Sequence, residues 1–236
     1  MVAIYFAVLM AFLQPPFASG TSNAAWAKGA MPLRSCANPS APGAGHLPSP
    51  DRAVVIDMEC DEGEALKLRV TALGRTHSVA LRDGSAELLW APNSRVFVIN
   101  GAESGYAGLF VDVFHIEPNR VRRQAIDRQV QADMVSQFPP CKAAGAAETC
   151  KTIETHPEFN VSAIAWTGAS STIILVAEVP CSSAYGGIMC QVRGYEVRAV
   201  NGQIVREMSP RQLKREYQPH MAWQLRIPDA PKYRQR

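Results

Sequence analysis

The stretch Trp90-Ala-Pro-Asn-Ser-Arg-Val-Phe-Val-Ile-Asn100 decides the predicted fold, because in it a polar turn leads directly into an apolar strand. Pro, Asn and Ser are turn-forming residues, and the residues that follow are rich in the β-branched and aromatic side chains that favour strands. Two other stretches show the same order of features, Ser49-Pro-Asp-Arg-Ala-Val-Val-Ile-Asp57 and Trp166-Thr-Gly-Ala-Ser-Ser-Thr-Ile-Ile-Leu-Val-Ala177. The sequence therefore predicts an internal repeat of strand end, polar turn and apolar strand.

The spacing of these stretches fits one supersecondary unit per repeat. Pro50 and Pro92 are 42 residues apart, which is within the period of one β-propeller blade. Trp90 and Trp166 are 76 residues apart. Removing a predicted helix and loop between them leaves roughly one further period. Three repeats are therefore expected within residues 49–208, with a helix and loop insertion at 124–157.

The turn of each repeat resembles the Trp/Leu-Ser-Pro-Asp-Gly turn that separates the first two strands of a blade in TolB-like and WD-type β-propellers. Ser49-Pro50-Asp51 matches that turn, Ala91-Pro92-Asn93 matches it in part, and the third copy has neither the Pro nor the Asp. The resemblance covers residues 45–208. It implies a mainly β fold of antiparallel, four-stranded, blade-like repeats, a partial β-propeller with two short helices. A β-sandwich or a barrel is the alternative.

Three blades cannot close a ring, since propellers have four to eight. The chain is therefore expected to close a ring as a homo-oligomer, to be a truncated relic of a propeller, or to form an open array of sheets. An open array leaves edge strands that need covering, and the two predicted helices are the candidate covers.

The first predicted helix has one apolar stripe, formed by Ile126, Val130, Met134 and Phe138. The second begins at a capping box, in which Ser209 caps the N-terminus and Gln212 reaches back, with Pro210 at the first helical position. Between the last two predicted strands, Asn201-Gly202 is the sequence of a two-residue type I′ hairpin turn, because both residues accept a positive φ.

The N-terminal residues predict export. Residues 2–13 form an apolar run that is too short to cross a bilayer but suits a signal peptide, although no Lys or Arg precedes it. Cleavage is expected after Ala18-Ser19-Gly20 or Ala25-Trp26-Ala27. The predicted organisation is a signal peptide at 1–27, a flexible Ala/Gly/Pro/Ser-rich arm at 28–48, the β-repeat domain at 49–208, and a C-terminal helix and basic tail at 209–236. The mature chain is expected to be periplasmic or secreted.

Six cysteines in an exported chain predict three disulfides. Cys141 with Cys150 and Cys181 with Cys190 would each close a short loop, which costs little chain entropy. Cys36 and Cys60 remain as the third pair. The chain has no Cys-x-x-Cys motif and no Cys–His pair at ligand spacing, so no metal site is predicted.

The sequence holds few signals of chemistry. Charged residues make up 19% of the chain and the net charge is only +3, so no nucleic-acid partner is expected. No nucleophile elbow, phosphate-binding glycine motif or run long enough to span a membrane is present, and no cofactor is predicted. Trp90 and Trp166 hold corresponding places in the repeat. They are candidates for binding a sugar or peptide, and their alternative role is packing between blades.

Two functions are therefore hypothesised. The first is an exported, non-catalytic binding or interaction module of the bacterial envelope, with a protein or another envelope component as its ligand. The alternative is a secreted hydrolase or lyase that uses carboxylates such as Asp57, Glu59 or Asp112 as acid and base. An enzyme should bring two or more of these carboxylates together in one site.

Overall fold

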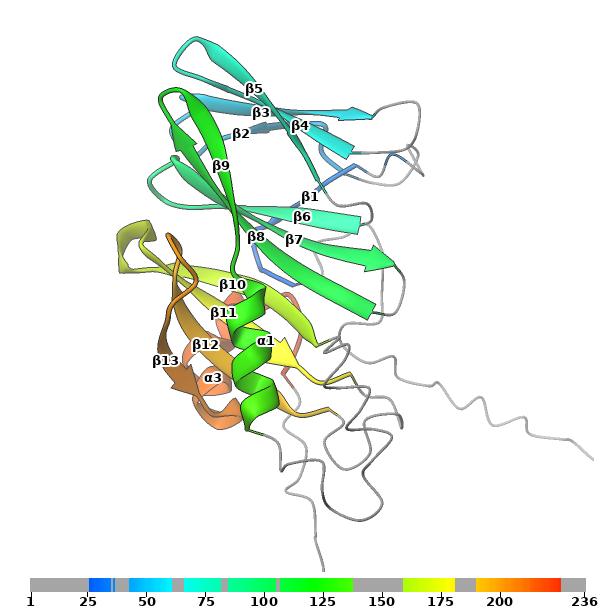
Figure 1. Cartoon of the computed structure of the whole chain (residues 1–236), viewed down its shortest axis with the longest axis vertical. Helices are drawn as coiled ribbons and strands as arrows, with labels where there is room; N and C mark the ends of the chain where they lie inside the picture. Colours follow the sequence, from blue (N-terminus) through cyan, green and yellow to red (C-terminus); the bar gives the residue numbers. More distant parts are fainter. Residues whose placement is uncertain are drawn as a thin grey trace, which may run out of the picture.

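Three antiparallel sheets are stacked in the computed structural model of the chain (Figure 1). The structure describes residues 26–34, 36, 43–60, 66–81, 85–104, 107–137, 159–180 and 190–225. The first sheet contains β2 (His46–Pro48), β3 (Val54–Cys60), β4 (Leu66–Ala72) and β5 (Arg75–Ala80). The second contains β1 (Met31–Pro32), β6 (Ser85–Trp90), β7 (Val96–Ser104), β8 (Ala107–Glu117) and β9 (Arg120–Ala125). The third contains β10 (Asn160–Thr167), β11 (Thr172–Glu178), β12 (Val192–Arg198) and β13 (Ile204–Met208).

Each sheet is a meander in which consecutive strands are neighbours, except that β1 pairs with the outer side of β6. This confirms the predicted mainly β fold of antiparallel sheets, which have four, five and four strands, and the sheets are not closed into a barrel. The second strands, β3, β7 and β11, begin at Val54, Val96 and Thr172. These three residues are the ones that the sequence repeat aligns.

Burial along the strands shows which faces of the stack are covered. Leu66, Leu68 and Val70 of β4 are buried and alternate with half-buried Lys67 and exposed Arg69, because only one face of the first sheet is packed. In β11 every residue after Thr172 is buried, because both faces of the third sheet are covered. One end of the stack is therefore a solvated polar sheet face, and the other is covered by protein.

One apolar core lies between the first and second sheets and another between the second and third. The helix α1 (Asp127–Ser136) packs against β8, β10 and β11. Its side chains Val130 and Met134, together with the preceding Ile126, are buried in the second of these cores, which confirms that part of the predicted stripe. Phe138 lies outside the described residues.

The helix α3 (Pro210–Tyr217) and the short 3₁₀ turn η3 (Gln218–His220) cover the outer face of the third sheet. Ser209 Oγ accepts a hydrogen bond from the Gln212 amide, and Gln212 Oε1 accepts one from the Ser209 amide, as the sequence predicts. Leu213 is fully buried against this face. Among the described residues, the outer face of the third sheet is therefore covered by α3 and η3, and the outer face of the first sheet is polar. Association into a homo-oligomer stays a prediction.

The chain preceding the first sheet is part of the fold. Ala27 is fully buried and Trp26 nearly so, and Ala27 forms a β-bridge with Met221. The buried Glu87 carboxylate accepts hydrogen bonds from the Ala27 amide, at 2.9 Å, and from the Asn100 side chain, at 2.8 Å. The side chain of Asn100 also exchanges two hydrogen bonds with the Ala163 backbone. This polar contact joins the N-terminal segment, the second sheet and the third sheet.

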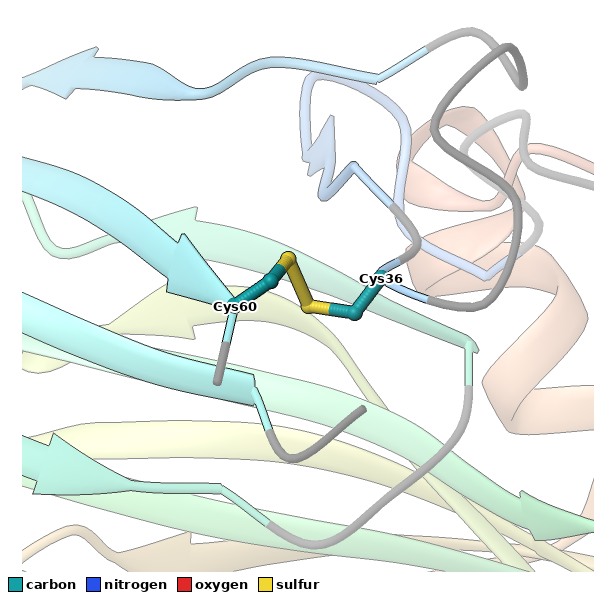
Figure 2. The surroundings of a disulfide bond; sticks show 2 residues. All are labelled: Cys36 and Cys60. Atoms are coloured by element: carbon teal, nitrogen blue, oxygen red, sulfur yellow. A yellow bond between two sulfur atoms is a disulfide. The ribbon is translucent and has the colours of Figure 1, made fainter. Parts of the chain in front are cut away.

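The segment 28–48, expected to be a flexible arm, supplies two strands in its described part. β1 pairs with β6, and β2 forms the first strand of the first sheet, so the first sheet begins before position 49. A disulfide joins Cys36 to Cys60 at the end of β3, with a Cα–Cα distance of 5.5 Å (Figure 2). This confirms the third predicted pair. Cys190 is also disulfide-bonded, whereas Cys141, Cys150 and Cys181 lie outside the described residues.

The Asn201-Gly202 turn differs from the expected two-residue hairpin. The strands β12 and β13 are closed by a bond between the Arg198 amide and the Gln203 carbonyl, which leaves four residues in the loop. Only Gly202 has a positive φ, of 73°, and its amide bonds to the Arg198 carbonyl. The Asn201 side chain accepts a hydrogen bond from the Gln203 amide instead. That turn, typical of Asn, replaces the type I′ conformation.

Within the described part of the chain, no helix is long and apolar enough to cross a membrane.

Candidate binding surface

Six turns lie at one end of the stack, at the left of Figure 1. In a four-stranded meander, the turn after the first strand and the turn after the third strand meet at the same end of the sheet. In this chain these turns are residues 49–53, 72–75, 91–95, 117–120, 167–171 and 198–203, and we call them together the turn end. The turn 167–171 includes a short 3₁₀ segment, η1 (Gly168–Ser170).

Hydrogen bonds between sheets hold the turns of the first row. The Asp51 amide donates to Ser94 Oγ at 3.2 Å, and the Asn93 amide donates to Ser170 Oγ at 3.1 Å. Each bond therefore runs from the first turn of one sheet to the first turn of the next, between positions that the sequence alignment matches. Ser94 and Ser170 are both buried, although they belong to turns.

Hydrogen bonds also hold the second row of turns. The Arg75 guanidinium donates to the Asn119 side chain, which joins the last turns of the first and second sheets. His115 Nε2 donates to the Ala199 carbonyl at 3.1 Å, which joins the second sheet to the last turn of the third. The turn end is therefore a fixed surface shared by three sheets.

Several turn residues adopt the left-handed backbone conformation without being glycine. Arg52, Ser94 and Ser170 have φ values of 60°, 57° and 78°. They correspond to the glycine position of the Ser-Pro-Asp-Gly turn that the sequence resembles. In the last turn of the first sheet, Leu73 and Gly74 have φ values of 52° and 72°. Positive φ is uncommon for non-glycine residues and is costly for a bulky one.

The turn end is positively charged. It contains five arginines, Arg52, Arg75, Arg95, Arg120 and Arg198, and two carboxylates, Asp51 and Glu117. Hydrogen bonds from Ser49 and the Ala53 amide hold the pKa of Asp51 below its ordinary value. Hydrogen bonds from Arg120 and then Arg122 do the same for Glu117. Both carboxylates therefore stay ionised near neutral pH, and the arginines still outnumber them.

Two aliphatic side chains project from this charged surface. Leu73 is 62% exposed and Val200 is 55% exposed, and both lie in the last turn of their sheets. Pro118 is exposed in the corresponding turn of the second sheet. The turn end therefore combines arginines with exposed apolar tips, which is a common composition for interaction surfaces.

Trp90 and Trp166 lie at equivalent ends of β6 and β10, as the repeat predicts. Trp90 packs edge-on against Phe97, with ring centroids 5.3 Å apart, in the core between the first and second sheets. Trp166 packs on the core between the second and third sheets, and its Nε1 donates to the Leu89 carbonyl at 3.3 Å. Both indoles are half-buried and pack in the cores between sheets.

The carboxylates of the hydrolase hypothesis are not arranged as one acid and base pair: two lie on one sheet face, each paired with a basic side chain, and the third is buried in another sheet. Asp57 contacts His46 Nδ1 at 2.7 Å, and Glu59 accepts from Arg69 at 2.8 Å, both on the solvated face of the first sheet. Asp112 is fully buried in the second sheet and forms an ion pair with Arg123. Among the residues that the structure describes, no three His, Cys, Asp or Glu side chains are grouped as a metal site.

One buried carboxyl group was not singled out by the sequence. Glu178, at the end of β11, is only 4% exposed and pairs with Asn160 across the sheet. Burial raises the pKa of Glu178 to about 8, although a hydrogen bond from the Asn160 side chain favours the charged form. The sequence gives no sign that this carboxyl group is buried, because Glu178 is a single charged residue at the end of an otherwise apolar strand.

Reasoning from the sequence also missed the arginines of the turn end. Arg75 and Arg120 each begin the last strand of a sheet, β5 and β9. Arg52 and Arg95 lie one position apart when the first turns are aligned. A comparison of the turns, rather than of the strands, would have identified this recurring charge.

The chain matches no protein-family model, no curated protein and no solved structure.

Proposed function

We propose that this protein is an exported, non-catalytic binding module of the bacterial envelope that contacts its ligand through the turn end. The observation that carries the proposal is the composition of that surface, five arginines and two exposed aliphatic tips on turns that are hydrogen-bonded to one another. Binding surfaces that are fixed before contact lose less entropy on association.

The disulfide chemistry supports an extracytoplasmic location. Cys36–Cys60 is formed, Cys190 is also oxidised, and none of the described cysteines is free. Disulfides persist in oxidising compartments such as the bacterial periplasm. The protein is therefore proposed to be periplasmic or secreted.

The pairing of these carboxylates with basic side chains favours binding over hydrolysis. A glycoside hydrolase needs two carboxyl groups on either side of one bond, whereas Asp57 and Glu59 each have a basic partner on an exposed sheet face. Asp112 belongs to another sheet and is paired with Arg123. We therefore propose that the protein binds an envelope component without catalysing a reaction on it.

The test is capture from envelope extract with the immobilised chain, beside a variant with Arg52→Gln and Arg198→Gln. We expect the parent chain to retain a specific envelope component and the variant to lose it, with the same melting temperature. Equal capture by the parent and the variant would show that the turn end is not the binding surface. Turnover of a cell-wall polymer that is lost in Asp112→Asn, but kept in the double variant, would establish the enzyme instead.

A further inference from the structure

We infer that the turn end docks on an anionic lipid bilayer, with arginines at the headgroups and the tips Leu73 and Val200 in the outermost apolar layer. This inference rests on the proposed function and names the ligand class of the same surface. It follows from the position, charge and backbone conformation of the turns.

The first step is the position of the apolar tips. Leu73, Pro118 and Val200 occupy the last turn of the first, second and third sheets, and each side chain is exposed. The last turns are linked from sheet to sheet by the contacts of Arg75 and His115. Three apolar tips are thus presented side by side at one end of a stack about 20 Å deep, from the usual spacing of packed sheets.

The second step is the backbone of Leu73. It has a φ of 52° and stands before Gly74, with φ of 72°, in the two-residue turn between β4 and β5. Asn, Asp or Gly would adopt this conformation with less strain. Burial of the Leu73 side chain does not offset this backbone strain, since the residue is 62% exposed. A strained and exposed Leu is better explained by a contact outside the chain than by stability.

The third step is the charge that surrounds these tips. Arg75 follows Leu73 by two residues, Arg120 follows Pro118 by two, and Arg198 precedes Val200 by two. A guanidinium binds phosphate through paired N–H donors. Basic residues near an anionic leaflet and aliphatic side chains below the headgroups are the two contributions that bind peripheral proteins to membranes.

The combination favours a bilayer over a soluble polyanion. A nucleic acid or an acidic polysaccharide would use the arginines, but it offers no apolar layer for Leu73 and Val200. An acidic protein would contact the arginines and part of the apolar surface, and binding of such a protein is one possible outcome of the test. A bilayer of phosphatidylglycerol and phosphatidylcholine engages the whole surface.

The experiment is sedimentation of the chain with vesicles of phosphatidylcholine alone or mixed with phosphatidylglycerol, at low and high ionic strength. The N-terminus is defined by mass spectrometry and is the same in every variant, so that it contributes equally throughout. We expect binding only to the mixed vesicles, and weaker binding at high ionic strength. The double variant Arg52→Gln, Arg198→Gln should bind about 25-fold more weakly, since each basic residue contributes about five-fold.

Leu73→Asn separates binding from folding. Asn followed by Gly suits the turn better than Leu followed by Gly, so the melting temperature should rise or stay the same. Binding to the mixed vesicles should nevertheless fall about ten-fold, because the aliphatic tip is lost. The matched controls are Val205→Thr, at an aliphatic residue 51% exposed on β13, and the double variant Arg211→Gln, Lys214→Gln on α3. Both should bind like the parent.

Each result decides between the two proposals. Equal binding of Leu73→Asn and the parent, or equal loss in the α3 double variant, would overturn the bilayer inference. Absence of binding to mixed vesicles would overturn it as well, and specific capture of an envelope component in the previous experiment would then leave the proposed function standing. Failure of both experiments would overturn both. Binding to the mixed vesicles that needs the arginines but not Leu73 would show attraction to the headgroup charge alone, and it would overturn the proposed insertion of the apolar tips.

Discussion

Ser94 Oγ accepts a hydrogen bond from the backbone amide of Asp51 at 3.2 Å, although 43 residues separate the two in the chain. The same bond recurs between Asn93 and Ser170, at 3.1 Å and a separation of 77 residues. A contact that recurs at corresponding positions of successive units shows that the units are stacked in the same way. The first turns therefore fix the alignment of the three sheets.

Ser94→Ala is expected to destabilise the protein by about 1 kcal/mol, because the Asp51 amide loses its acceptor. Ser94→Gly should cost less, because glycine relieves the positive φ of 57° while losing the same bond. Urea unfolding of the three proteins measures both differences. Arg52→Gly is the control: it occupies the same place in the first turn, with φ of 60° and no such bond, and should be stabilising. A Ser94→Ala variant as stable as the parent would show that this bond does not matter.

Val130→Asp is expected to destabilise the protein severely, by more than about 3 kcal/mol, because Val130 is fully buried between α1 and the sheets. Gln129→Asp should change stability little, since Gln129 is exposed on the same helix. Thermal unfolding followed by circular dichroism compares the two. Equal melting temperatures for Val130→Asp and the parent would mean that α1 does not hold the second and third sheets together.

Sequence patterns predicted the fold where local and long-range signals agree. The strands that begin at Val54, Val96 and Thr172 follow a polar turn and are rich in apolar side chains, which pack against a neighbouring sheet. The capping box at Ser209 and the stripe from Ile126 to Met134 are likewise local patterns. The strands β1 and β2 were missed because they are short and Pro-rich, and they form only by pairing with β6 and β3.

The candidate surface was harder to predict than the fold. Its arginines are far apart in the chain and only the stacking of the sheets brings them together. In the sequence, Leu73 is an ordinary apolar residue beside a glycine. Only the structure shows that it lies in the turn between β4 and β5, where its side chain is exposed. Trp90 and Trp166 were conspicuous in the sequence, yet their indoles pack between sheets.

Replacing both Cys36 and Cys60 by Ser is expected to destabilise the protein by about 3 kcal/mol, because the bond closes a segment of 24 residues. Denaturant unfolding under oxidising conditions measures this difference. The N-terminal segment carrying Cys36 should become sensitive to protease in the variant. Non-reducing peptide mapping checks the other two predicted pairs, and a peptide joining Cys150 to Cys190 would contradict both.

The mature N-terminus is expected upstream of Trp26. Cleavage after Ala18-Ser19-Gly20 would keep Trp26 and Ala27, which are buried and hydrogen-bonded to the Glu87 carboxylate. Cleavage after Ala25-Trp26-Ala27 would remove both and leave the Glu87 carboxylate buried with fewer hydrogen-bond donors, which is costly. Mass spectrometry of the exported protein should therefore find Thr21 at the N-terminus. A chain beginning at Lys28 would refute this choice, and a chain with Met1 intact would refute export.

The stability of the protein is expected to depend on pH through Glu178. Burial raises the pKa of this carboxyl group to about 8 in the folded state, against an ordinary value of 4.5. Between these two values the folded state keeps a proton that the unfolded state has lost. The stabilisation is therefore complete below pH 4.5 and is lost as the pH rises through 8, at up to about 1.4 kcal/mol per pH unit.

Glu178→Gln tests this dependence directly, because the amide is similar in shape to the protonated carboxyl and does not titrate. Near pH 5 the variant and the parent should have similar free energies of unfolding. Near pH 8 the variant should be the more stable. At that pH the parent must either take up a proton when it folds, which is unfavourable at a low proton concentration, or bury a charged carboxylate beside Asn160. Urea unfolding at a series of pH values gives the difference between the two proteins at each pH, so that every other titrating group cancels. A constant difference from pH 5 to pH 8 would show that Glu178 has an ordinary pKa in the folded state.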